Sequence, residues 1–188
     1  MEQNQKWWLD FTLKEALFIG LCAMLIVLTK TVLRLNLKIS GHAMFFTMFF
    51  LLLAKGCVGR KWTASTVSLL AALCLMLFAP GKAGPIGLVR FMLPGIFCDL
   101  SVRFCPFLLD GAISFAILAG GAAFARLPGS FLVDWFVGMP PDIALSHAFI
   151  KCIMGAAFGL IGGVAAWPVL KRLRTAGLAP QSLRAQTS

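Results

Sequence analysis

Residues 84–99 decide the fold, and they read GPIGLVRFMLPGIFCD. This apolar run contains one arginine, one Pro-Gly pair and one aspartate. Inside lipid an ionisable side chain is costly unless it faces a partner or a water-filled cavity, so Arg90 is a candidate functional residue. In a helix, Arg90 and Asp99 lie roughly 13 Å apart along the axis and on opposite faces, so they cannot pair directly. Pro94-Gly95 permits a kink between them, because proline leaves a backbone carbonyl free.

The composition predicts an integral membrane protein. The 188 residues are 60% hydrophobic and only 13% charged, a balance typical of chains with several apolar spans. At about 20 residues for each span, the length accommodates about six membrane helices and leaves almost no room for a soluble domain. The predicted fold is therefore an all-α integral membrane protein, in which residues 1–188 form a single bundle of six transmembrane helices.

Apolar runs and turn signals place the six spans. The run Pro140-Pro141-Asp142 marks a stop followed by a new helix, with Asp142 as its predicted cap. The connection before this run is itself apolar, which predicts a short helix lying in the membrane interface or over a cavity. The predicted spans are 13–33, 43–58, 62–79, 85–105, 107–125 and 143–170, and residues 171–188 form a tail.

The distribution of lysine and arginine predicts a multi-pass topology in the cell inner (cytoplasmic) membrane with both termini in the cytoplasm. Over the ends of six spans, ten basic residues fall on the side of the termini and five on the other, as the positive-inside bias requires. The five are Lys30, Arg34, Lys38, Lys82 and Arg126. The net charge of +10 comes from short clusters between apolar runs, which argues against nucleic-acid binding.

Small residues predict where helices approach one another closely. Three of them share one face of the first span, and this face either packs inside the bundle or docks a partner subunit. A similar set in the fifth span predicts a packing face. The two sets are Ala16, Gly20 and Ala23, and Ala112, Ala116 and Gly120.

In the last span a polar residue or a glycine recurs at every fourth position from His147 to Gly163. His147 and Lys151 are followed by Gly155, Gly159 and Gly163. Residues four apart lie nearly above one another on a helix, so two polar groups sit over a glycine groove on one face. We predict that this face is not exposed to lipid.

The cations of the fourth and sixth spans come to the same end of the predicted bundle. Two fixed cations favour an anionic group on a ligand, and nearby aromatics favour a flat or apolar body. The predicted ligand-binding residues are His42, Arg90, Asp134, Trp135, Asp142, His147 and Lys151. The alternative is structural: Arg90 and Lys151 pair with Asp134 or Asp142, or extend to the membrane interface.

The remaining polar residues predict neither catalysis nor metal binding. Asp99 and Asp110 are expected to pair with Arg103 or to bond helix ends. The six cysteines show no CxxC spacing and are expected to be small buried hydrophobes. There is no GxSxG, HExxH or P-loop pattern, so we expect no enzyme activity and no cofactor, and energised transport would need a partner ATPase.

Over most of its length the chain resembles the substrate-binding S component of energy-coupling factor (ECF) type vitamin transporters. The resemblance lies in the length, the six spans, the short second span, the Gly/Pro-rich residues 84–99, and the face formed by Ala16, Gly20 and Ala23, where that family carries an AxxxA-like motif. Here Gly20 replaces the second alanine. The resemblance implies capture of a vitamin or related micronutrient at the outer face. It also implies docking through the first span onto a membrane coupling subunit served by two cytoplasmic ATPases.

Two other functions remain open at this stage. The first is a metal or corrin-related uptake component that uses His42 and His147, although the neighbouring Arg90 and Lys151 oppose a metal cation. The second is a membrane scaffold without transport activity, whose small-residue faces only join partner helices. Replacing Arg90 or Lys151 separates these functions, because only a transport component would lose a ligand.

Overall fold

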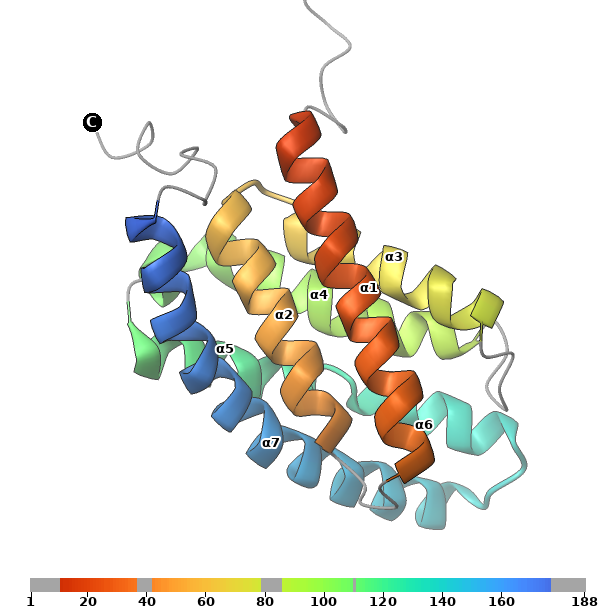
Figure 1. Cartoon of the computed structure of the whole chain (residues 1–188). Coiled ribbons are helices and arrows are strands. Elements are labelled where there is room, and N and C mark those ends of the chain that lie inside the picture. Colours follow the sequence, from red (N-terminus) through yellow and green to blue (C-terminus); the bar gives the residue numbers. More distant parts are fainter. Residues whose placement is uncertain (1–10, 37–41, 79–85, 110, 177–188) are drawn as a thin grey trace, which may run out of the picture.

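The computed structural model describes residues 11–36, 42–78, 86–109 and 111–176. Within these residues the fold is all-helical and contains no strand, which confirms the all-α part of the prediction (Figure 1). The elements are α1 (Leu13–Asn36), α2 (His42–Val58), α3 (Thr63–Phe78), α4 (Ile86–Phe104), the short 3-10 helix η1 (Pro106–Leu109), α5 (Ala112–Phe124), α6 (Leu127–Phe136) and α7 (Pro141–Thr175).

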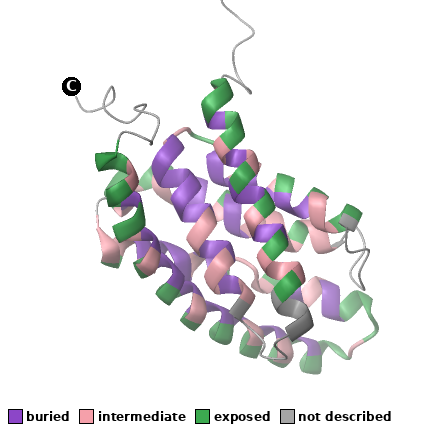
Figure 2. Cartoon of the chain, in the orientation of Figure 1, coloured by how far each residue is buried: buried purple, intermediate pink, exposed green. Residues whose placement is uncertain are grey.

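Three segments are long and apolar enough to cross a membrane, namely Leu13–Val32, Ala112–Phe136 and Pro141–Thr175. Many apolar side chains are exposed at the surface, and on α1 exposed positions recur along the length of the helix (Figure 2). These exposed apolar positions are Leu13, Leu17, Leu21, Met24, Leu28 and Val32. A soluble protein rarely exposes such a large apolar area, whereas lipid tails solvate it. The described residues therefore form an all-α fold of the kind found in membranes.

Helix α7 packs most extensively against α5 and α2. Its contacts are close because glycine removes the side chain where backbones meet. A Cβ atom on Gly163 would lie 2.6 Å from the carbonyl oxygen of Phe115, and one on Gly162 would lie 2.5 Å from that of Phe45. The predicted inward face of α7 is confirmed at Gly155, Gly159 and Gly163, which are all buried, whereas His147 and Lys151 on the same face are half-buried.

The predicted packing face of α5 is wrong in part. Gly120 is buried as expected, but Ala112 and Ala116 are only half-buried. The buried face is instead centred on Phe115, which is fully enclosed and packs edge-on against Trp167 of α7, with ring centroids 5.5 Å apart. A large aromatic side chain contributes more burial energy than alanine, so it sets the rotation of the helix.

A substitution in α7 tests this close packing. Gly163→Ala is expected to lower the free energy of unfolding by about 1–3 kcal/mol, because the new methyl group meets the backbone of α5. Gly20→Ala in α1 is the matched control, since nothing lies within 4 Å of a Cβ atom there. Thermal unfolding of the two variants in the same detergent measures the difference. Equal unfolding temperatures would contradict the packing described here.

Two helix starts show different capping. At α1 the backbone N–H of Thr12 donates to Oε2 of Glu15 at 2.8 Å, and the N–H of Glu15 donates to the Thr12 hydroxyl at 3.4 Å, which is a reciprocal capping box. At α7 the predicted cap by Asp142 is wrong. Pro140 occupies the capping position with no side-chain cap, and Pro141 begins the helix, as suits a residue without an N–H donor.

A buried ion pair joins α2, α3 and α4. Lys55 Nζ lies 2.5 Å from Asp99 Oδ1, with side-chain exposures of 3% and 2%. Asp99 Oδ2 also accepts hydrogen bonds from the backbone N–H and the hydroxyl of Ser65, both at 2.7 Å. The prediction that Asp99 bonds a helix end is therefore confirmed, whereas its ionic partner is Lys55 and not the exposed Arg103. Asp110 lies outside the described residues.

The cysteines behave largely as small apolar residues. All six are free, and four of them are buried. The buried four are Cys22, Cys57, Cys98 and Cys152, and the half-buried two are Cys74 and Cys105. This distribution agrees with a packing role for most of them.

Candidate functional site

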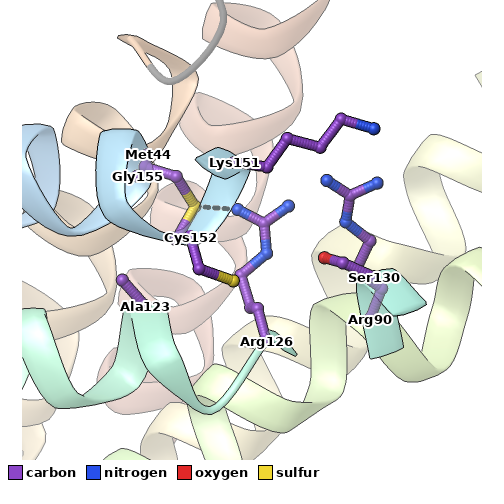
Figure 3. A pocket seen from close by; sticks show the side chains of 8 residues that line it. All are labelled: Met44, Arg90, Ala123, Arg126, Ser130, Lys151, Cys152 and Gly155. Carbon is purple, nitrogen blue, oxygen red and sulfur yellow. Dashed lines mark hydrogen bonds between the residues drawn. The ribbon is translucent and has the colours of Figure 1, made fainter. Parts of the chain in front are cut away.

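Four basic side chains from four parts of the fold converge at one end of the bundle. They are Lys30 of α1, Arg90 of α4, Arg126 at the turn between α5 and α6, and Lys151 of α7, and we call them the cation cluster. Three of them line a small cavity together with the side chains of α2, α5, α6 and α7 (Figure 3). The lining residues are Met44, Arg90, Ala123, Arg126, Ser130, Lys151, Cys152 and Gly155.

Local backbone features bring these elements together. Gly129 of α6 packs directly on α4, where its Cβ atom would lie 3.0 Å from Cα of Arg90. Gly155 of α7 likewise admits the side chain of Met44, whose Cγ would lie 3.3 Å from a Cβ atom at that position. Pro94 follows Arg90 by four residues and cannot donate to the Arg90 carbonyl, which proline leaves free in a helix. Gly129 and Gly155 thus allow close helix contacts beside Arg90 and Lys151.

Phe91 supports two members of the cation cluster. The Lys30 amine lies 3.5 Å from the centre of the Phe91 ring, and the Arg126 guanidinium carbon lies 6.0 Å from it. Cations are attracted to the face of an aromatic ring, most strongly when water is excluded. Arg126 also contacts the sulfur of Met44. These contacts hold both cations in place without supplying any negative charge.

Asp134 is the carboxylate that meets the cation cluster. Its Oδ2 lies 3.0 Å from Nδ1 of His147, and both of its oxygens lie 3.5 Å from Nζ of Lys151. It also attracts the guanidinium of Arg90. The Asp134 side chain is 12% exposed, compared with 26% for Lys151 and 42% for His147. The structural pairing considered from the sequence is therefore present between Lys151 and Asp134.

The cluster nevertheless keeps an excess of positive charge. Counted by formal charge, the four basic side chains and the single carboxylate of Asp134 give +3. Among the described residues, the buried Nε atoms of Arg90 and Arg126 also have no hydrogen-bond partner. Unpaired buried donors and like charges in proximity both cost free energy. An anion that accepts these hydrogen bonds would relieve both costs.

The cavity itself is small in this conformation. Its volume is about 10 Å³, enough for about one water molecule, whereas sites for small-molecule ligands typically measure about 300–1,000 Å³. Figure 3 shows why: the long side chains of Arg90, Arg126 and Lys151 reach into the space between the helices. A ligand must displace these side chains from the centre of the site to enter.

The structure brings together some of the predicted ligand-binding residues and separates others. Arg90 and Lys151 line one cavity, and Asp134 and His147 lie beside Lys151. Trp135 does not line it: this side chain is 51% exposed and stacks on Phe131.

Two further predicted residues are not placed in the cavity. Asp142 is exposed at the start of α7 and is absent from the cavity lining. The side chain of His42 is outside the part of the structure that is described. No three metal-binding side chains come together within the described residues.

Sequence reasoning missed Lys30 and Arg126 as site residues. In the sequence both residues contribute only to the distribution of basic charge at the ends of the predicted spans. The available signal was their location on the side predicted to carry the fewer basic residues, since positive charges there would run against the general bias of membrane proteins. Such charges are better explained by a role in a binding site than by membrane topology.

Comparisons of the chain with protein-family models, with curated proteins and with solved structures gave no match.

Proposed function

We propose that this chain is the substrate-binding subunit of an energised uptake system in the cell inner membrane. It captures a small anionic micronutrient at the outer face and delivers it through a membrane coupling subunit served by two cytoplasmic ATPases. The observation that carries the proposal is the cation cluster, in which four basic side chains from four parts of the fold come together and Lys151 pairs with Asp134. Such a concentration of charge is unfavourable in a membrane protein unless it serves a solute.

The arrangement of the helix ends supports the proposed orientation. Arg60, in the turn between α2 and α3, bonds Glu15 near the start of α1 at 3.1 Å. Arg174, at the end of α7, donates to the carbonyl of Gly56 near the end of α2 at 3.1 Å. The start of α1 and the end of α7 thus lie at the same end of the bundle (Figure 1). With both termini in the cytoplasm and six spans, the cation cluster opens outward.

The first helix supplies a surface for the proposed coupling subunit. Ala16 is exposed, and nothing lies within 4 Å of a Cβ atom built on Gly20. Both positions therefore allow another helix to approach closely. Ala23, in contrast, is fully buried in the bundle, so it supports the packing of α1 and not the docking of a partner.

The alternative functions account less well for the cation cluster. A metal cation would be repelled by three uncompensated positive charges, which disfavours the uptake of free metal ions. A scaffold that only joins helices gains nothing from a buried charge excess and would be more stable with apolar residues in its place. An enzyme would need a reactive constellation in addition to the charges.

Native mass spectrometry of the gently purified protein tests the proposal. We expect a co-purifying anionic small molecule, and we expect Arg90→Gln and Lys151→Gln to lower its occupancy about tenfold or more, since each removes a charge-assisted hydrogen bond. Lys171→Gln is the control, because this lysine is exposed at the far end of α7. Full retention of the solute by both site variants, or a cationic solute, would contradict the proposal.

A further inference from the structure

We infer that the group bound by the cation cluster is a phosphate monoester, which carries two negative charges on one tetrahedral centre. Lys30 and Arg126 hold this group together with Arg90 and Lys151. The inference rests on the proposed function, since it names the class of solute that the same site accepts. It follows from the charge, the donor geometry and the contacts of these four side chains.

The charge of the cluster requires more than a single negative charge. Asp134 of α6 already compensates one cation, because it contacts Lys151 and His147 of α7. Lys30, Arg90 and Arg126 lie within electrostatic reach of one another, and Asp134 acts on this group at Arg90. In the same formal count a monocarboxylate would leave +2, whereas a phosphate monoester, with about −1.5 to −2 at pH 7, leaves about +1 to +1.5.

The available donors also suit a tetrahedral oxyanion. In Figure 3 the head groups of Arg90, Arg126 and Lys151 extend into one space from three different elements. The unbonded Nε atoms of Arg90 and Arg126 leave each guanidinium an additional donor. Arginine binds phosphate through two parallel hydrogen bonds, and lysine adds a compact charge from any direction. Two arginines and two lysines can therefore surround three phosphate oxygens.

The resting contacts of Lys30 and Arg126 are easily exchanged for an anion. Both rest on the ring of Phe91, and Arg126 also touches the sulfur of Met44. A cation–π contact or a sulfur contact is weaker than a charge-assisted hydrogen bond to phosphate. Entry of the anion would therefore draw these side chains from Phe91 and Met44 onto the oxyanion. This rearrangement also opens the site beyond its resting volume of about 10 Å³.

Two phosphate esters of similar shape but different charge test the inference. Methyl phosphate is a dianion near pH 8, and dimethyl phosphate is a monoanion at every working pH. We expect the purified protein in neutral detergent to bind methyl phosphate about tenfold or more tightly than dimethyl phosphate in isothermal titration at constant ionic strength. Equal affinities for the two esters, or tighter binding of the diester, would overturn the inference.

Variants test the role of the two newly assigned cations. Lys30→Gln and Arg126→Gln are each expected to weaken methyl phosphate binding about tenfold, with Lys171→Gln as the unchanged control. Arg126→Lys retains the charge but loses the two-pronged geometry, so it is expected to recover only part of the affinity. Thermal unfolding verifies that each variant is folded. Where a variant does not fold, the comparison of the two esters on the unaltered protein still tests whether the site prefers a phosphate monoester.

The phosphate could belong to a free solute or to a lipid. Nanodiscs of phosphatidylcholine with and without phosphatidic acid distinguish the two, because phosphatidic acid carries a phosphate monoester. Undiminished methyl phosphate binding beside phosphatidic acid assigns the site to a soluble phosphate ester. Competition by phosphatidic acid supports the same chemistry but assigns it to a lipid headgroup.

Failure of this inference and failure of the proposed function give different results. If native mass spectrometry finds a monocarboxylate solute that depends on Arg90 and Lys151, and the two esters bind equally, the uptake function stands and the phosphate assignment fails. If the protein carries no anionic solute and binds neither ester, both fail.

Discussion

Lys55→Ala is expected to lower the free energy of unfolding by about 3–5 kcal/mol. The substitution leaves the carboxylate of Asp99 without its ionic partner at a site where both side chains are almost fully buried. Removing one member of a buried ion pair is strongly destabilising, because the remaining charge can neither reach water nor find another partner. Lys55 also donates to the carbonyls of Arg60 and Lys61, at 2.7 and 3.2 Å, so the turn between α2 and α3 loses its attachment as well.

The double variant Lys55→Met, Asp99→Leu separates the charge from the packing. It removes both ions and keeps apolar volume, so most of the lost stability should return. The recovery should be incomplete, because Asp99 also accepts the backbone N–H of Ser65 at the start of α3. Arg103→Ala, an exposed change on α4, is the control and should have little effect. Unfolding in graded mixtures of mild detergent and sodium dodecyl sulfate measures all three variants. If Lys55→Ala loses no more stability than the control, the buried ion pair does not stabilise the fold as described.

Asp134→Asn is expected to have the second largest effect, with opposite consequences for the free and the anion-bound protein. It raises the formal charge of the cation cluster and residue 134 together from +3 to +4. We expect the free protein to lose about 2 kcal/mol, less than at Lys55, because Lys151 and His147 retain contact with water. Added methyl phosphate should raise the unfolding temperature of this variant more than that of the unaltered protein, since the anion then meets a larger positive charge.

Asp142→Asn is the matched control for this prediction. Asp142, in the first turn of α7, is also a carboxylate, but it is exposed and does not line the cavity. Its replacement should change neither the unfolding temperature nor the response to methyl phosphate. A smaller response to the anion in Asp134→Asn than in the unaltered protein would mean that the carboxylate positions the cations, and that its charge is not the deciding factor.

Much of the helical architecture could be predicted because its signals are local. Apolar runs bounded by Pro-Gly and Pro-Pro pairs predict helices close to those observed, and the first span was expected to begin at Leu13, where α1 begins. The inward face of α7 was likewise readable from glycines spaced by four. Each of these features depends on neighbouring residues within one helix, so one sequence is sufficient to see it.

Part of the site could also be predicted, for a different reason. A charge inside an apolar run is conspicuous, so Arg90 and Lys151 were recognised as candidates, and they line one cavity. Arg126 and Lys30 lie near the ends of helices, and no spacing or motif in the sequence joins them to Arg90. The contact of Lys30 with Phe91 links residues far apart in the chain.

The sequence by itself determined the all-helical class, the approximate positions of the helices and the presence of costly charges within them. Hydrophobic content and spacing act along one segment and need no knowledge of its neighbours. Only the tertiary structure decided which charges meet. Asp99 is four residues from Arg103, yet it bonds Lys55 at a separation of 44 residues. The rotation of each helix, set by where glycines and large side chains pack, determines which polar groups face the same space.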